Sequence, residues 1–141
     1  MTVTFLGTGT SQGIPIIGST HPVCLSSDFK DQRLRVSVLI EWDNYSYVID
    51  CGPDFRQQML RAGCDRIDGI VFTGGIGENS AFLRNAVIDK LEFLGCKLDQ
   101  QLNESTVAGK SDFISSATSL PVLVVATNEE WLIAGETARI V

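Results

Sequence analysis

The chain has 141 residues, 44% of them apolar and 20% charged, a composition typical of one globular domain rather than a disordered chain. Its net charge of −6 argues against broad nucleic-acid binding, because neutralising phosphates requires clustered Lys and Arg. No apolar run reaches the roughly 18 residues of a membrane span, and the N-terminal residues lack a basic segment followed by an apolar stretch. We therefore expect no secretory signal, and a cytoplasmic protein that binds neither membranes nor nucleic acid.

The first part of the chain predicts three strands. Residues 3–6 form a short apolar run, and apolar residues alternate with polar ones from Leu34 to Trp42, which is the period of a half-buried strand. Asp43 and Asn44 then predict a tight turn, with residues 45–49 as the hairpin partner of the preceding strand.

A helix and a buried strand follow the hairpin. Pro53 suits the first position of a helix, where its missing N–H costs nothing, and Gly63 suits a left-handed C-terminal cap. Residues 67–73 form a continuous apolar run, which predicts a strand buried on both faces.

The remaining elements alternate between helix and strand. Asn79 or Ser80 is expected to cap a helix that ends at Gly95. Its apolar stripe would face the sheet and consists of Leu83, Val87, Leu91 and Leu94. Residues 97–120 predict a loop with one or two weak strands, residues 121–127 a second buried strand, and Asn128 the cap of a last helix.

The order of elements is therefore β-β-β-α-β-α-β-α. A meander followed by right-handed crossovers predicts an α/β fold with a single mixed sheet in two or three layers, and the order matches a ribonuclease-H-like arrangement. No linker separates the two halves, so we expect one domain over residues 1–141. Unpaired strands at the edges of the sheet would be places for self-association.

Three segments carry a resemblance in the first half of the chain. They are Thr4-Phe5-Leu6-Gly7-Thr8-Gly9-Thr10-Ser11-Gln12-Gly13-Ile14-Pro15, the strand at 35–40, and Tyr47-Val48-Ile49-Asp50-Cys51-Gly52-Pro53-Asp54. Through them residues 1–73 resemble the metallo-β-lactamase superfamily, in particular its phosphodiesterase-like members. The resemblance implies that Asp50 ends a strand and supports the metal-binding loop.

The metal-binding residues of that superfamily are missing from the chain. A His-x-His-x-Asp-His motif should follow Thr73, because a two-metal site needs several imidazoles and a bridging carboxylate. Gly74-Gly75-Ile76-Gly77 stands there instead, and the only histidine is His21. His21 and Cys24 could form half of an accessory zinc site, but a surface histidine is the simpler interpretation, and the four cysteines are expected to be reduced thiols.

A second resemblance covers residues 67–141. Its carriers are Asp68-Gly69-Ile70-Val71-Phe72-Thr73-Gly74-Gly75-Ile76-Gly77-Glu78-Asn79-Ser80, then Leu91-Glu92-Phe93-Leu94-Gly95, residues 121–125, and Thr127-Asn128-Glu129-Glu130-Trp131. These residues resemble the C-terminal part of acetate kinase. The resemblance implies that Gly75, Ile76, Gly77, Glu78 and Asn79 contact ATP and that Glu129 is associated with magnesium.

The rest of an acetate kinase site is not matched anywhere in the chain. That family draws its acetate pocket, catalytic arginines and phosphate loops from sequence that precedes this segment, and phosphoryl transfer depends on such cations. We therefore expect a chimera of two half-domains, engineered or recombined, with no complete catalytic site and no required cofactor. The alternative is residual weak binding of ATP and magnesium through the Gly-rich turn.

Overall fold

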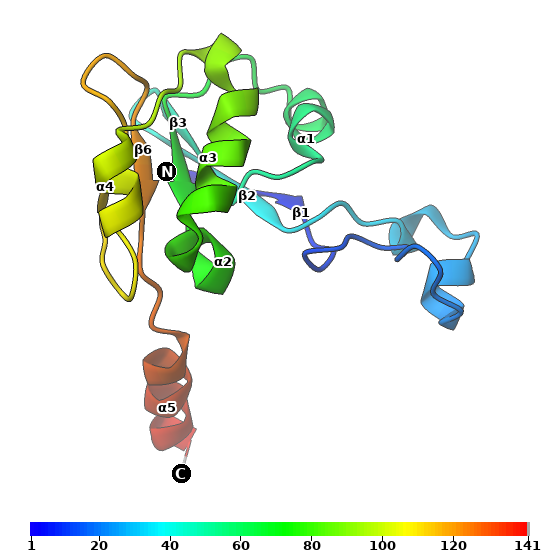
Figure 1. Cartoon of the computed structure of the whole chain (residues 1–141). Helices are drawn as coiled ribbons and strands as arrows, with labels where there is room; N and C mark the ends of the chain where they lie inside the picture. Colours follow the sequence, from blue (N-terminus) through cyan, green and yellow to red (C-terminus); the bar gives the residue numbers. More distant parts are fainter. Residues whose placement is uncertain (141) are drawn as a thin grey trace.

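The alternating apolar residues of the first half become the strands of a six-stranded sheet in the computed structural model, which describes residues 1–140 (Figure 1). The strands are β1 (Thr2–Gly7), β2 (Ser37–Trp42), β3 (Tyr45–Ile49), β4 (Gly69–Phe72), β5 (Asp112–Phe113) and β6 (Val122–Val124). The helices are α1 (Phe55–Ala62), α2 (Gly74–Asn79), α3 (Ala81–Lys90), α4 (Gln100–Ser105) and α5 (Glu129–Ile140). Short 3-10 helices are η1 (Pro22–Leu25), η2 (Phe29–Asp31) and η3 (Glu92–Leu94).

The strands lie in the order β1-β2-β3-β4-β6-β5. Strands β1, β2 and β3 pair antiparallel, β3, β4 and β6 pair parallel, and β5 returns antiparallel to β6. The expected α/β class with one mixed sheet is confirmed. The strands of both halves thus belong to one open sheet, and the parallel pair β3–β4 joins them.

The predicted hairpin turn and helix caps are confirmed at positions where the residue type favours the local backbone conformation. Asp43 and Asn44 adopt φ of 50° and 64°, the positive values that a two-residue type I′ hairpin turn requires. Gly63 closes α1 with φ of 65°, and the hydroxyl of Ser80 accepts a hydrogen bond from the N–H of Leu83 at the start of α3.

Two expected boundaries near β2 and α1 are wrong. Residues 34–36 lie outside β2, and Pro53 precedes α1 instead of occupying its first position. Asp54 explains both changes, because its carboxylate accepts hydrogen bonds of 2.8 Å from the backbone N–H and from the Nη1 of Arg35. This contact holds Asp54 outside α1 as its N-cap residue.

The expected order of elements lacked two helices, whereas β5 confirms the weak strand expected in residues 97–120. Residues 74–79 form α2 immediately after β4, where the sequence predicted only a glycine-rich turn. The stretch 97–120 contains α4 as well as the short β5. The amide-rich composition of this stretch concealed α4, whose N-cap is the side chain of Asp99.

The predicted apolar stripe of α3 is confirmed in part, because Leu91 is buried and Val87 and Leu94 pack against the core. Leu83 is instead 42% exposed, and Arg84 and Ile88 are buried in addition. The guanidinium of Arg84 occupies the interior, where it donates to the backbone oxygens of Gly77, Glu78, Asn103 and Thr106 and to Oδ1 of Asn103. Burial lowers the pKa of Arg84. The hydrogen bonds of the Arg84 side chain therefore connect α2, α3 and α4.

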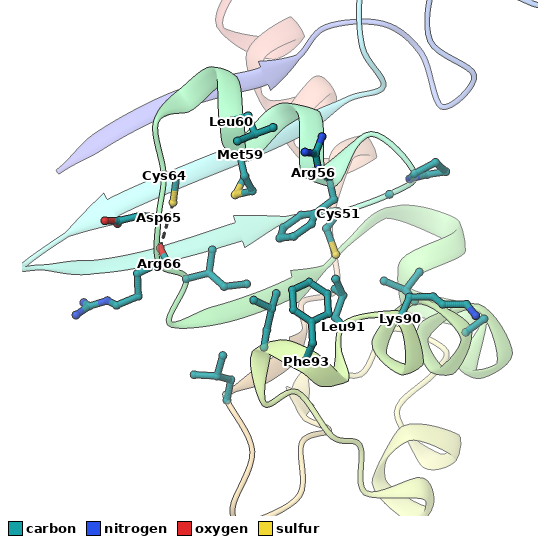
Figure 2. Close-up of a pocket in the computed structure, with 18 residues that line it drawn as sticks. Cys51, Arg56, Met59, Leu60, Cys64, Asp65, Arg66, Lys90, Leu91 and Phe93 are labelled. Atoms are coloured by element: carbon teal, nitrogen blue, oxygen red, sulfur yellow. Dashed lines mark hydrogen bonds between the residues drawn. The ribbon is translucent and has the colours of Figure 1, made fainter.

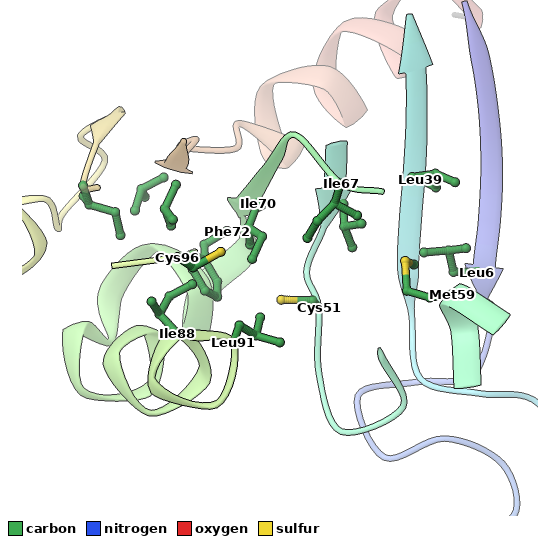
Figure 3. Packing of buried hydrophobic residues seen from close by; sticks show 14 residues of the cluster. Leu6, Leu39, Cys51, Met59, Ile67, Ile70, Phe72, Ile88, Leu91 and Cys96 are labelled. Carbon is green, nitrogen blue, oxygen red and sulfur yellow. The ribbon is translucent and has the colours of Figure 1, made fainter. Parts of the chain in front are cut away.

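The core lies between the sheet and helices α1 and α3 (Figure 3). It includes one face of the central strands, with Leu39, Val48, Ile70 and Val122 almost completely buried. The other buried apolar residues are Leu6, Cys51, Met59, Ile67, Phe72, Ile88, Leu91, Cys96, Ile114 and Val124.

The opposite face of the sheet is uncovered, so the expectation that β4 is buried on both faces is wrong. Val71 is only half-buried, although its neighbours Ile70 and Phe72 are buried. The register places a row of apolar side chains on this uncovered face, and none of them is charged: Val3, Phe5, Val38, Ile40, Trp42, Tyr45, Tyr47, Ile49, Val71, Phe113 and Leu123. We call this set the open face.

Two segments extend away from the sheet in Figure 1. One is the arm between β1 and β2, which carries η1 and η2, and the other is α5. The cap of α5 is confirmed, because Oδ1 of Asn128 accepts from the N–H of Trp131, yet every residue of α5 is exposed. Within residues 1–140, no helix is long and apolar enough to cross a membrane.

The Arg84 contacts generate a stability prediction. Replacing Arg84 by Met should lower the free energy of unfolding by about 3 kcal/mol or more, because several buried carbonyl groups would lose their donors. Urea denaturation followed by circular dichroism measures the change. Arg61→Met on the exposed side of α1 serves as the control and should stay within about 0.5 kcal/mol of the parent. An Arg84→Met protein as stable as this control would contradict the assigned role.

The open face generates a second prediction. An uncharged apolar surface of this extent favours association, so the protein should self-associate as its concentration rises. Replacing both Phe5 and Trp42, which are 71% and 65% exposed, by Lys should shift the population toward monomer in sedimentation-velocity experiments. The matched control replaces Phe29 and Phe82, which are exposed elsewhere, by Lys. A parent protein that remains monomeric at millimolar concentration would refute this expectation.

Candidate functional site

The junction between the two halves is held by Asp50, which directly follows β3. Its carboxylate accepts hydrogen bonds from the hydroxyl of Thr73 and, at 2.7 Å, from the backbone N–H of Thr73. Burial raises the pKa of Asp50, and the two bonds from Thr73 oppose that rise. Asp50 ends a strand, as the metallo-β-lactamase resemblance implied, and here it positions the residue that precedes α2.

The three glycines of α2 differ in whether the structure requires a residue without a side chain at their position. Gly74 adopts φ of 66°, a left-handed value that favours glycine. A Cβ on Gly77 would lie 3.3 Å from the backbone and side chain of Phe72, so close packing explains that glycine. A Cβ on Gly75 would meet no atom within 4 Å. Neither its conformation nor its packing requires Gly75 to lack a side chain.

Glu78 links α2 to the end of β6. Its Oε1 accepts hydrogen bonds from the backbone N–H of Thr127 at 2.8 Å and from the Thr127 hydroxyl at 2.6 Å. Only 8% of Glu78 is exposed. The hydrogen bonds from Thr127 lower the pKa of Glu78, because they favour its charged form. The partnership spans 49 residues of sequence and was not predicted.

A small cleft of about 300 Å³ opens beside this contact. Of the predicted site residues, Gly75, Glu78 and Glu129 line it together. The remaining lining residues, which the site prediction did not include, are Gly74, Thr127, Asn128 and Glu130. The structure therefore brings the glycine-rich segment and the acidic start of α5 to one place, although they are far apart in sequence.

Three other predicted site residues do not line the cleft. Ile76 is 63% exposed and Gly77 packs on Phe72. Asn79 serves the local backbone, since its side chain donates to the carbonyl of Gly75 and accepts from the N–H of Ala108. These contacts give Ile76, Gly77 and Asn79 no shared orientation toward a ligand.

The charged side chains that line the cleft are all acidic. Glu78, Glu129 and Glu130 line it, and no Lys, Arg or His of the described residues does. A phosphate group entering alone would be repelled, whereas a magnesium–phosphate complex would bring the missing positive charge. Within residues 1–140, no three His, Cys, Asp or Glu side chains are arranged as a metal site.

His21 has a local role in the arm. Its Nδ1 accepts a hydrogen bond from the N–H of Val23 and caps η1. Cys24 lies in the same 3-10 helix, and its sulfur accepts from the N–H of Ile16. Neither residue takes part in a three-ligand cluster within the described part of the chain. His21 is thus an exposed residue that caps η1.

Known proteins are similar to the chain in two ways. An acetate kinase from Chromobacterium violaceum is 52% identical over 81 residues, which cover 57% of this chain and 20% of the relative. A diphosphatase of the PhnP family has a crystal structure that is 52% identical over 52% of this chain and 29% of its own, with a TM-score of 0.48. The chain thus spans only about a fifth of the length of the curated acetate kinase.

The acetate kinase likeness extends to solved structures. The acetate kinase of Entamoeba histolytica is 32% identical, with a TM-score of 0.51, over 60% of this chain and 22% of its own. The acetokinase family pattern matches residues 54–135, which include α2, the cleft and the first part of α5. Since this segment is more than half of the 141 residues, the chain belongs to the acetokinase family.

Proposed function

We propose that this chain binds a magnesium–nucleotide complex weakly at the cleft beside Gly75 and carries out no catalysis by itself. The observation that carries the binding proposal is the open space at Gly75, next to Glu78 and Glu129. Because Gly75 lines the cleft and carries no side chain, a ligand could approach its backbone closely. Membership of the acetokinase family supports a nucleotide as that ligand.

The absence of catalysis follows from the charge that phosphoryl transfer requires. The transferring group must be surrounded by cations, and every charged residue lining this cleft is an acid. The matched segment is also only about a fifth of an acetate kinase. For the phosphodiesterase chemistry of the other resemblance, the chain would need a cluster of imidazoles, and it has one histidine.

We infer further that the chain is a chimera whose halves meet in the segment 68–73. Both resemblances share this segment, and the likeness to a PhnP-family diphosphatase as well as to acetate kinases supports the inference. The ribonuclease-H-like arrangement belongs to this proposal too. Its support is the alternation of strands and helices in the acetate-kinase-like half, in which β4 is followed by α2 and α3, and β6 by α5.

Nucleotide titration tests the proposed binding. A micromolar site is worth about 8 kcal/mol, so losing roughly half of its contacts leaves a millimolar Kd or weaker. ATP with magnesium should shift the amide NMR signals of Gly75, Glu78 and Glu129, and ATP with EDTA should shift them much less. Acetyl phosphate should not form above a control without protein.

Variants make the nucleotide titration specific. Gly75→Val should abolish the shifts at Glu78 and Glu129, because its side chain would occupy the space left for the ligand. Gly135→Val is the matched control, since a Cβ at Gly135 in α5 also meets no atom within 4 Å. Equal shifts in the two variants would show that ATP does not bind in the cleft. A low-micromolar Kd or measurable kinase activity would show that the site is more complete than proposed.

The Glu78–Thr127 contact gives a pH prediction. Because the pKa of Glu78 is lowered on folding, its ionised form stabilises the protein above the ordinary value of 4.5, and this contribution is lost as the pH falls through the folded-state pKa. Glu78→Gln should therefore be less stable than the parent at pH 7, and the difference should shrink below pH 4.5. Urea denaturation at several pH values measures it, with Glu92→Gln as an exposed control. A difference that is independent of pH would contradict the assignment.

A further inference from the structure

A second cavity lies on the covered side of the sheet, between α1 and α3 (Figure 2). It is a groove of about 1050 Å³, at the upper end of the volumes typical of small-molecule sites. Its floor is apolar and is built by Cys51, Phe55, Met59, Ile67 and Leu91. Burial raises the pKa of the Cys51 thiol to about 12, so this floor stays uncharged at neutral pH.

The rim of the groove is cationic. Arg56 lies on α1 and Lys90 is the last residue of α3, and both are exposed. Neither makes an ion pair or side-chain hydrogen bond with another residue of the described chain 1–140. The third rim cation, Arg66, pairs with Asp68 at 3.0 Å, and the rim has one acid, Asp65. The chain has a net charge of −6, yet this groove places two cations without an ion-pair partner beside an apolar floor.

We propose that this groove binds an amphiphile with an apolar tail and a single anionic head, namely a medium-chain alkyl carboxylate. The tail would cover the floor at Met59 and Leu91, and the carboxylate would lie at the rim, where Arg56 on α1 and Lys90 at the end of α3 both supply positive charge. The open face of the sheet is also apolar, but it has no charged residue, so it offers nothing to an anionic head. The cations of the rim thus distinguish this site from the open face.

The expected contributions differ between tail and head. Each methylene buried on the floor should tighten binding by about fourfold. The two rim cations are solvent-exposed, so each should contribute only a few-fold, and their effect should decrease with salt. Chain length should therefore control most of the affinity, whereas the head group should determine which amphiphiles are preferred.

Decanoate is the probe for the first experiment, used below its micelle concentration and at low salt with the complete chain. Amide and methyl NMR signals of Met59, Ile67 and Leu91 should shift with decanoate, and octanoate, which has two methylenes fewer, should bind about sixteenfold more weakly. Decanol, which has the same tail and no charge, should bind several-fold more weakly than decanoate. Shifts confined to Phe5 and Trp42 on the open face, or no saturable binding, would overturn the proposal.

Surface variants provide the second experiment. Arg56→Gln with Lys90→Gln should weaken decanoate binding by about tenfold and leave decanol binding unchanged. The matched control, Arg61→Gln with Lys97→Gln, removes the same charge from exposed positions outside the groove. Ala86→Trp, which fills the groove from its exposed wall, should abolish binding of both probes. Equal decanoate affinities in the two charge variants, or retained binding in Ala86→Trp, would show that the groove is not the site.

Discussion

Parallel pairing between β3 and β4 joins the two halves of this protein, and a hydrogen-bonded contact closes the pair at its carboxyl end. Val48 and Ile70 lie opposite each other in the register, and both are completely buried. Just beyond them, Asp50 accepts from the N–H and hydroxyl of Thr73. This contact determines where the chain leaves β4 and enters α2. The position of the cleft follows from it, because α2 supplies both Gly75 and Glu78.

The two faces of the sheet carry apolar surfaces that differ in the charged residues around them. Helices α1 and α3 pack on one face of the sheet, and the groove between them has cations at its rim. The other face carries uncharged side chains across all six strands, and α5 extends away without covering it. An uncharged face favours association with another apolar surface, whereas a cation-rimmed groove favours an anionic ligand. The two surfaces should therefore respond to different variants.

The cleft combines open space at Gly75 with acidic side chains around it. Thr127 occupies one oxygen of the Glu78 carboxylate, and Gly75 leaves space beside it. With acids at Glu129 and Glu130 and no cation lining the cleft, phosphates gain positive charge only from a metal ion that accompanies them.

The sequence by itself determined the local features: the turn at Asp43–Asn44, the cap at Gly63 and the hydroxyl cap at Ser80 all depend on residues within a few positions. It also indicated the α/β class and the two resemblances. Only the tertiary structure decided which faces are covered, why Arg84 is buried, and that Glu78 meets Thr127. These features depend on contacts between residues 19 to 49 positions apart, which no local periodicity encodes. A strand pattern likewise shows that a side is apolar, but the placement of distant helices decides whether that side is covered.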